Sequence, residues 1–312
     1  MGMLVDGRWT SDDALRSGAK GEFLRPVSPY RHWIGAEDGR FPAEAGRYHL
    51  FVNAGCPWAY RTILYRSLKG LDGIVSLSHT EAAAGPEGWT FGDEPESLLG
   101  ARHMHDVYSA ADPTFTGRCT VPVLWDLQTR TIVNNESADI IRMFDSAFAA
   151  LPGVKVERYY REPYQAEIDA LNAEIYDNVN NGVYRCGFAR SQTAYDEAFD
   201  ALFATLDRLE ERLEGQRYLC GSEITETDWR LFSTLVRFDV AYHGIFRCNR
   251  QRLADYAHLW PYTRDLYQQP GVAETVDLQA IKGIYYGSRG FGILPRGPAI
   301  DFAAPHNRDR LS

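Results

Sequence analysis

The sequence has 312 residues, 45% of them hydrophobic and 24% charged, and this length predicts two globular domains because a single hydrophobic core usually stops growing earlier. The formal net charge of −9 and the scatter of Lys and Arg along the chain exclude a nucleic-acid-binding protein, which needs a clustered basic surface. Because the sequence contains neither a run of roughly 20 apolar residues nor the apolar core of a signal peptide, we expect a cytoplasmic protein without a membrane partner.

The first predicted strand and helix of the chain flank a cysteine. Residues 1–45 are rich in Gly, Pro and charged residues, which predicts an irregular N-terminal extension. The apolar run 48–53 is typical of a β-strand, and apolar residues at helical spacing predict a helix over 58–68. Cys56 and Pro57 stand between the two, and proline is favoured in the first turn of a helix. The sequence therefore places Cys56 at the start of a helix.

The next elements predict the rest of a thioredoxin-like domain. A strand over 73–78 would form a βαβ unit with parallel strands. Two further strands, over 121–125 and 131–133, flank a short loop and predict an antiparallel pair that closes the sheet. A helix then begins around Glu136 and Ser137 and runs to residue 148.

From residue 151 onward the pattern is helical. Thr225 and Asp228 form a capping box, which predicts the start of a buried helix. The expected fold is thus an α/β N-terminal thioredoxin-like domain over 46–150, followed by an all-α C-terminal domain over 151–312. The periodic segments of the second domain are 164–180, 194–213, 229–240 and 252–267.

Cys56 is the candidate nucleophile. At the start of a helix, the helix dipole and unpaired backbone N–H groups favour a thiolate over a thiol. The alternative is a small buried apolar residue, which is the commoner state of an arbitrary cysteine. The five cysteines are far apart and include neither a CxxC pair nor a Cys/His cluster at metal-ligand spacing, so we expect thiols, with no disulfide framework and no metal.

The reaction partner of Cys56 must come from outside the chain. The motif Cys56-Pro57-Trp58-Ala59 ends in Ala, so it has no resolving thiol three residues after the first. Glutathione is the obvious cytoplasmic thiol, and we expect it as co-substrate.

Two further motifs favour glutathione binding. A cis bond before Pro122 would expose the backbone of Val121 for pairing with the peptide; the alternative is an edge-strand proline. At the start of the following helix, Ser137 and the helix N–H groups suit the γ-glutamyl carboxylate, and Glu136 suits its ammonium. A simple capping role is the alternative for this pair.

Several sequence blocks, spread over most of the chain, resemble the xi class of the glutathione transferases. They are NAGCPWA (53–59), GWT (88–90), TVPVLWD (120–126), NNES (134–137), NNGVY (180–184) and IKGIYYGS (281–288). The resemblance implies the glutathione transferase fold, a homodimer, and the reduction of glutathionyl-hydroquinones with glutathione. The resemblance assigns Cys56 as the nucleophile. It implies a glutathione site made by Trp89, Val121, Glu136 and Ser137. It also implies a hydroquinone site made by Tyr184, Tyr285 and Tyr286, of which Tyr184 and Tyr285 are taken as catalytic.

The sequence departs from the class pattern at two positions where His is usual, Tyr60 and Ile284. These changes could retune the substrate pocket. The nearest alternative function is an omega-like transferase that reduces dehydroascorbate or small mixed disulfides, which needs Cys56 but not the tyrosines. A non-catalytic binding protein is a second alternative, which the presence of Cys56 disfavours.

Overall fold

The computed structural model describes residues 2–11, 17–288 and 293–311 and divides into two compact units. The first unit comprises Met1–Ala14, Pro26–Glu157 and Thr275–Leu294. The second comprises Leu15–Arg25, Arg158–Glu274 and Pro295–Ser312. Each unit is therefore assembled from separate stretches of chain, whereas the sequence suggested contiguous domains.

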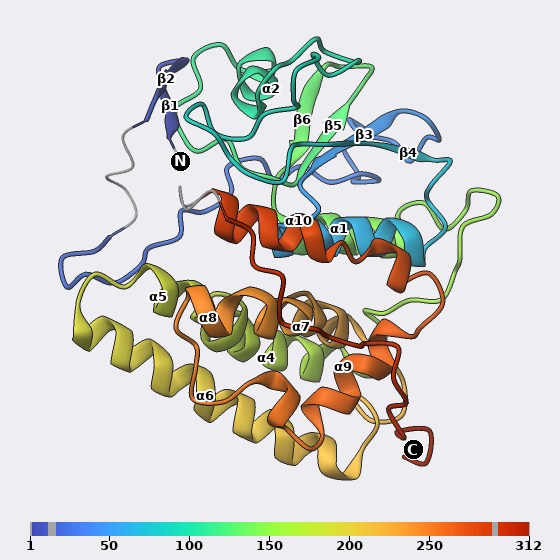
Figure 1. Ribbon diagram of the computed structural model, residues 1–312. Helices are drawn as coiled ribbons and strands as arrows, with labels where there is room; N and C mark the ends of the chain where they lie inside the picture. Colours follow the sequence, from blue (N-terminus) through green and yellow to red (C-terminus); the bar gives the residue numbers. More distant parts are fainter. Residues whose placement is uncertain (1, 12–16, 289–292, 312) are drawn as a thin grey trace. The chain divides into compact units, whose positions relative to one another are not determined.

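The first unit contains a four-stranded sheet with the order β4-β3-β5-β6 (Figure 1). The central strand β3 (Tyr48–Val52) is parallel to β4 (Val75–His79) and antiparallel to β5 (Val123–Asp126), which in turn pairs with β6 (Thr131–Asn134). All five residues of β3 are buried, as expected for an apolar strand covered on both faces. The sheet is that of the predicted thioredoxin-like domain.

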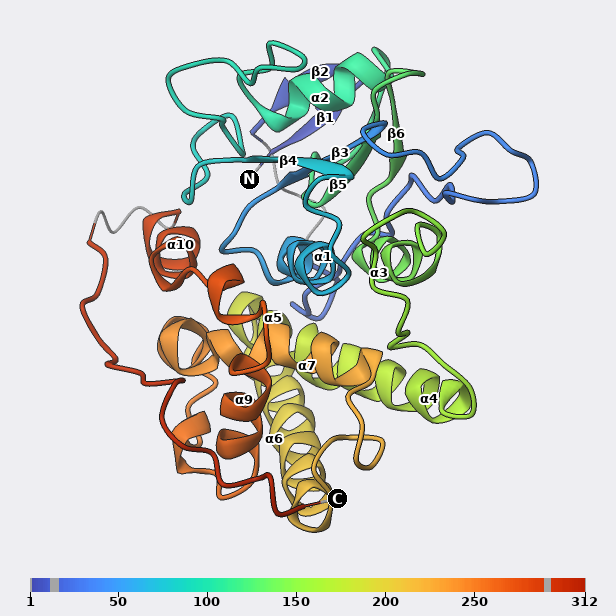
Figure 2. The ribbon, with the colours of Figure 1, turned by 90° about the vertical axis from the view of Figure 1, so that its right-hand side faces the viewer.

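Helices cover both faces of this sheet. The helices α1 (Pro57–Leu68) and α3 (Ser137–Ser146) lie side by side below the strands, and α2 (Met104–Ala111) lies above them (Figure 2). The short helix α2 was missed in the sequence, where it falls in a segment interpreted as irregular. The turn α10 (Leu278–Lys282) and the π-helical turn η6 (Gly283–Gly287) also belong to this unit, although they come from the C-terminal part of the chain.

The N-terminal extension is not wholly irregular, because it contains the hairpin β1 (Met3–Val5) and β2 (Arg8–Thr10). Its two-residue turn is Asp6-Gly7, and both residues have positive φ angles, 47° and 74°. Asp-Gly is a favoured pair for such a turn. The side chain of Leu4 is buried, and its backbone exchanges two 2.9 Å hydrogen bonds with Gly117.

The second unit is helical, and no strand lies among its described residues. The helix α7 (Glu226–Arg237) is buried over its whole length, and the predicted capping box at its start is confirmed: Asp228 accepts the backbone N–H of Thr225 at 2.7 Å. Across the described ranges, no helix is long and apolar enough to cross a membrane. The helices of this unit are α4 (Gln165–Ile175), α5 (Gly182–Phe188), α6 (Gln192–Gly215), α7 (Glu226–Arg237), α8 (His243–Ile245) and α9 (Leu259–Tyr267), with π-helical turns at Tyr176–Asn180 and Phe238–Tyr242 and 3₁₀ turns at Leu253–Asp255 and Ala273–Thr275.

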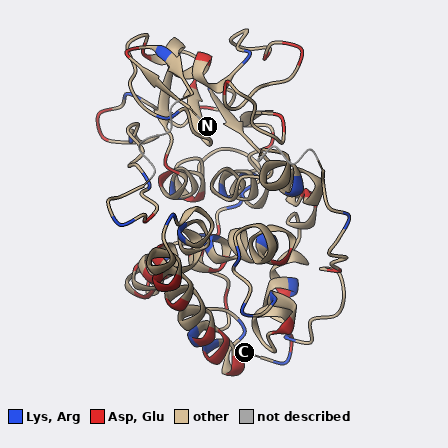
Figure 3. Cartoon of the chain, turned by 60° about the vertical axis from the view of Figure 1, so that its left-hand side comes forward, with Lys and Arg blue, Asp and Glu red and all other residues tan. Residues whose placement is uncertain are grey.

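Charge is unevenly distributed in the second unit. Acidic residues follow one another along α6 in Figure 3, and they contribute to the net charge of −9.

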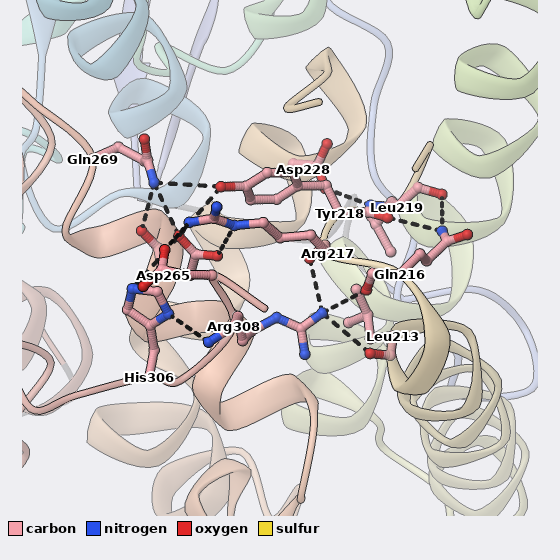
Figure 4. A network of polar contacts seen from close by, with 11 residues as sticks. Leu213, Gln216, Arg217, Tyr218, Leu219, Asp228, Asp265, Gln269, His306 and Arg308 are labelled. Atoms are coloured by element: carbon pink, nitrogen blue, oxygen red, sulfur yellow. Dashed lines mark hydrogen bonds and ion pairs between the residues drawn. The ribbon is translucent and has the colours of Figure 1, made fainter. Parts of the chain in front are cut away.

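Near the C-terminus, a buried arginine holds the end of the chain in place: Arg308 donates to the carbonyl oxygens of Leu213, Gln216 and Arg217 at 3.1, 2.6 and 2.8 Å (Figure 4).

Candidate active site

Cys56 is the N-cap residue of α1, and Pro57 is the first residue of that helix. The carbonyl oxygen of Cys56 accepts the N–H of Tyr60 at 2.8 Å, so the helix begins at the cysteine. The thiol side chain is 6% exposed, and its Sγ lies 4.0 Å from the carbonyl oxygen of Val121. The position at a helix start that was predicted from the sequence is confirmed.

The turn before Cys56 is fixed by Asn53 at the end of β3. The Asn53 side-chain oxygen accepts the N–H of Gly55 at 2.9 Å. Its amide group donates to Thr80 Oγ1 at 3.0 Å and to the Glu81 carbonyl oxygen at 2.7 Å. One side chain thus joins the cysteine turn to the segment that follows β4, which gives the thiol a defined position.

Three of the other cysteines are in environments that disfavour a thiolate. Burial raises the pKa of Cys119 to about 12 and the pKa of Cys220 to about 11. Burial also raises the pKa of Cys248, which lies beside the buried Cys186. All five cysteines are in the described part of the chain, and none of them forms a disulfide. Burial therefore keeps the thiols of Cys119, Cys220 and Cys248 protonated at neutral pH.

Val121 and Trp89 lie on loops of the same unit. The Val121-Pro122 peptide bond is cis, as predicted, and β5 begins at the next residue. Trp89 follows Gly88, whose φ of 78° is in the region that favours glycine. The carbonyl oxygen of Trp89 accepts the N–H of Met104 at 2.9 Å. Both side chains are largely buried.

Glu136 is the N-cap residue of α3, and Ser137 begins that helix. One carboxylate oxygen of Glu136 accepts the N–H of Ala138 at 3.1 Å, and the other accepts the hydroxyl of Ser28 at 3.0 Å. The capping role considered as the alternative is therefore present. This arrangement places the Glu136 carboxylate next to the N-terminal N–H groups of α3. A carboxylate can bind an ammonium group, and the N–H groups at a helix start can bind a carboxylate.

The turn that carries Tyr285 and Tyr286 packs directly on the cysteine turn. A Cβ atom on Gly55 would overlap the Ala280 carbonyl oxygen and lie 2.7 Å from Ile284 Cγ2, so only glycine allows this approach. Tyr285 is 4% exposed, whereas Tyr286 is half-buried and its pKa is raised by that burial. Sequence periodicity gave no sign of this contact, because 225 residues separate Gly55 from Ala280 along the chain.

Tyr60 and Ile284, the two residues that depart from the class pattern, both take part in the packing of residues 275–287. The Tyr60 hydroxyl lies 3.1 Å from Thr275 Oγ1, and Ile284 packs on Gly55. Both replacements are therefore at the contact that residues 275–287 make with the cysteine turn and α1.

Tyr184 is on α5 in the second unit. Its ring packs among aromatic side chains, with Phe246 at 5.2 Å between centroids, and the guanidinium of Arg25 lies 4.9 Å above it. Arg25 is fixed in turn by a 2.8 Å hydrogen bond from its Nε to Asn181. Since Tyr184 belongs to the second unit, its approach to Cys56 stays a prediction.

Comparison with known proteins identifies the family. Residues 55–147 match the glutathione S-transferase N-terminal domain and residues 192–265 the C-terminal domain. The glutathionyl-hydroquinone reductase of Sphingobium chlorophenolicum is 48% identical over 310 residues, which cover 96% of this chain and 97% of that protein. The glutathionyl-hydroquinone reductase of Escherichia coli is 46% identical over 325 residues, which cover 99% of both chains.

Solved structures agree with these matches. The glutathione-bound structure of the Escherichia coli protein superimposes with a TM-score of 0.90 at 44% identity and covers 99% of both chains. The xi-class glutathione transferase of Natrialba magadii superimposes with a TM-score of 0.94 at 44% identity, with coverage of 100% of this chain and 98% of that one. The predicted fold is confirmed, and the chain belongs to the glutathione transferase family, within its xi class.

Proposed function

We propose that this chain is a glutathionyl-hydroquinone reductase, with glutathione as co-substrate and Cys56 as the nucleophile. The observation that carries the proposal is the position of Cys56 at the start of α1, with its Sγ 4.0 Å from the Val121 carbonyl oxygen. Membership of the xi class and the names of the relatives from Sphingobium chlorophenolicum and Escherichia coli support it.

In the first step, the Cys56 thiolate attacks the sulfur of the glutathionyl-hydroquinone. A sulfur–sulfur bond forms between Cys56 and glutathione, and the bond between sulfur and the aromatic carbon breaks. The ring carbon keeps the bonding electron pair and must gain a proton. Because an aryl carbanion is a poor leaving group, the bond breaks more easily from a keto-like tautomer, in which a ring oxygen shares the charge.

In the second step, the thiolate of another glutathione attacks the mixed disulfide at the glutathione sulfur. Oxidised glutathione leaves, and the thiolate of Cys56 is regenerated. The net reaction converts one glutathionyl-hydroquinone and one glutathione into one hydroquinone and one oxidised glutathione. The two electrons that reduce the ring come from the two glutathione sulfurs.

The glutathione site that we propose surrounds the cysteine turn. The Val121 backbone would pair with the glutathione backbone, in the manner of an added strand. Ser137 and the N-terminal N–H groups of α3 would bind the γ-glutamyl carboxylate, Glu136 its ammonium, and Trp89 would pack against the peptide. The support is that the Glu136 carboxylate and the first turn of α3 lie together.

Tyrosines complete the proposed acceptor site. Tyr285, on the turn that packs on Gly55, and Tyr184 would donate protons or hydrogen bonds to the departing ring, and Tyr286 would bind it. We further propose that the protein works as a homodimer in the cytoplasm, where glutathione keeps thiols reduced.

A steady-state assay tests this function against its nearest alternative. Purified protein is given glutathione with glutathionyl-menadiol, and in parallel with dehydroascorbate. We expect turnover of the first substrate with one oxidised glutathione formed per hydroquinone. Reduction of dehydroascorbate without any turnover of glutathionyl-menadiol would replace the proposal by an omega-like function.

A further inference from the structure

Glu87, His103 and His105 bring three potential metal ligands together in the first unit. Glu87 Oε2 lies 3.3 Å from His105 Nε2 and 3.5 Å from His103 Nδ1, and all three ligand atoms lie within 4.8 Å of one another. A tetrahedral zinc ion with ligand bonds of about 2.0–2.2 Å separates its ligands by about 3.4 Å. The two distances from Glu87 therefore match the edges of such a site.

The second ring nitrogen of His105 has the partner that metal-binding histidines usually have. His105 Nδ1 lies 3.1 Å from the carboxylate oxygen Oδ1 of Asp106. This contact orients the ring, with Nδ1 against Asp106 and Nε2 toward Glu87, as for a metal-binding histidine with a carboxylate partner. Asp106 is itself held in place, because its other oxygen accepts the N–H groups of Arg102 and His103, both at 2.9 Å.

Aromatic packing fixes the orientation of the rings. The His103 and His105 rings stack with centroids 4.9 Å apart and an interplanar angle of 12°. Trp9 of the N-terminal hairpin also stacks on His105, with centroids 4.9 Å apart, and its Nε1 donates to the Pro86 carbonyl oxygen at 3.4 Å. The hairpin thus supports both the start of α2 and the loop that carries Glu87, and the two imidazole rings are held before any ion binds.

We propose that Glu87, His103 and His105 form a binding site for a divalent transition-metal ion of the zinc type. Two imidazoles and one carboxylate suit zinc, cobalt, nickel or copper, whereas calcium and magnesium require a set of oxygen ligands. Glu87 is exposed, so a fourth position is open to water. The site is separate from the proposed nucleophile, but Glu87 precedes Trp89 by two residues. A bound ion would therefore join the Trp89 loop to α2.

The test measures metal binding to the full-length protein without a histidine tag. Cys56→Ser serves as the parent, because a reactive thiolate would compete for zinc. Calorimetric titration with zinc is expected to give one ion per chain. His105→Ala and Glu87→Gln should each weaken binding on the order of tenfold or more, since changes even outside the ligand set typically cost that much. His243→Ala, which changes a half-exposed histidine of the second unit, should bind as the parent does.

Cobalt titration adds a spectroscopic readout of the ligands. Visible bands typical of nitrogen and oxygen ligation are expected in the parent and should be lost in His105→Ala. Circular dichroism checks the fold of each variant, and Glu87→Gln, at an exposed position, keeps the test valid if His105→Ala does not fold. The proposal is overturned if the parent binds no ion, if both ligand variants bind as the parent does, or if a thiolate-to-cobalt band appears.

Discussion

Cys56 and Val121 lie at the same end of the antiparallel strands β3 and β5, with 4.0 Å between the cysteine Sγ and the valine carbonyl oxygen. The thiol comes from the turn after β3, and the carbonyl belongs to the residues that lead into the neighbouring strand β5. A peptide that pairs with the backbone at Val121 would therefore have its own sulfur beside Cys56, which is the alignment that thiol exchange needs.

Cys56→Ser is expected to abolish turnover of glutathionyl-menadiol, because a serine hydroxyl is not ionised at neutral pH. Glutathione binding and thermal stability should change little, since serine is nearly isosteric with cysteine. Steady-state kinetics and glutathione titration by calorimetry measure the two effects. Cys119→Ser is the matched control and should keep its activity. Substantial turnover by Cys56→Ser would remove the cysteine from the mechanism.

Tyr184→Phe and Tyr285→Phe should lower turnover of glutathionyl-hydroquinones, by up to roughly 10²–10⁴-fold if the hydroxyl acts as a general acid. A small glutathione mixed disulfide needs no carbon protonation, because its leaving group is already a stable thiolate. The same variants should therefore keep most of their activity toward that substrate. Equal losses on both substrates would mean that the tyrosines only shape the pocket.

Gly55→Ala should destabilise the protein by about 1–3 kcal/mol and lower its activity, because the new methyl group overlaps the Ala280 carbonyl oxygen and Ile284. Urea unfolding and the glutathionyl-menadiol assay measure the two effects. Gly73→Ala is the matched control: its Cβ would meet no atom within 4 Å. If both variants have the same stability and activity, the packing of residues 275–287 on the cysteine turn is not required.

The buried His49 is expected to lower the free energy of unfolding of the protein in mild acid. Its ring is 2% exposed, and burial lowers its pKa from 6.5 to about 4. Above pH 6.5 the residue is neutral in both the folded and the unfolded chain. As the pH falls from 6.5 to about 4, only the unfolded chain binds the proton, which costs up to roughly 3 kcal/mol of stability.

His49→Gln removes this titration. Urea unfolding at several pH values between 7.5 and 4 should show a smaller decline of stability for the variant than for the wild type. Carboxyl groups titrate in the same way in both proteins, so the difference between them isolates His49. Parallel declines would show that the imidazole is protonated in the folded protein.

Arg308→Met is expected to destabilise the second unit by about 1–3 kcal/mol, because the carbonyl oxygens of Leu213, Gln216 and Arg217 lose a donor. Arg308 is 3% exposed, and methionine keeps most of the volume of the side chain. Arg310→Met, at an exposed position two residues later, is the control and should unfold at the wild-type urea concentration. Limited proteolysis near the C-terminus should increase for Arg308→Met alone.

Features that depend on neighbouring residues were predictable from the sequence. The position of Cys56 and the capping box at Thr225 each follow from a few adjacent residues, and the structure confirms both. The N-terminal hairpin was missed although its Asp6-Gly7 pair is a hairpin signal, because strands of three residues are too short for alternation to be recognised.

Features that depend on distant residues were not predictable. The contact between Gly55 and Ala280 and the cluster of Glu87 with His103 join segments whose sequences carry no mutual signal. No strand pattern follows residue 151, so residues 275–294 were expected in the helical domain, whereas the structure groups them with the first unit. Their packing on the cysteine turn is decided by close approach to a glycine, which a sequence pattern does not encode.

The discontinuity of the first unit has a consequence for biosynthesis. The ribosome completes residue 157 and must then make the helical segments before residues 275–294 can join the unit. At about 5–20 residues per second, this interval is on the order of ten seconds. During that time the nascent chain contains Cys56 without the segment that later packs on Gly55. Until residues 275–287 have been made, the thiol lacks this cover against oxidants and premature thiol exchange, and ribosome stalling in between would prolong that exposure.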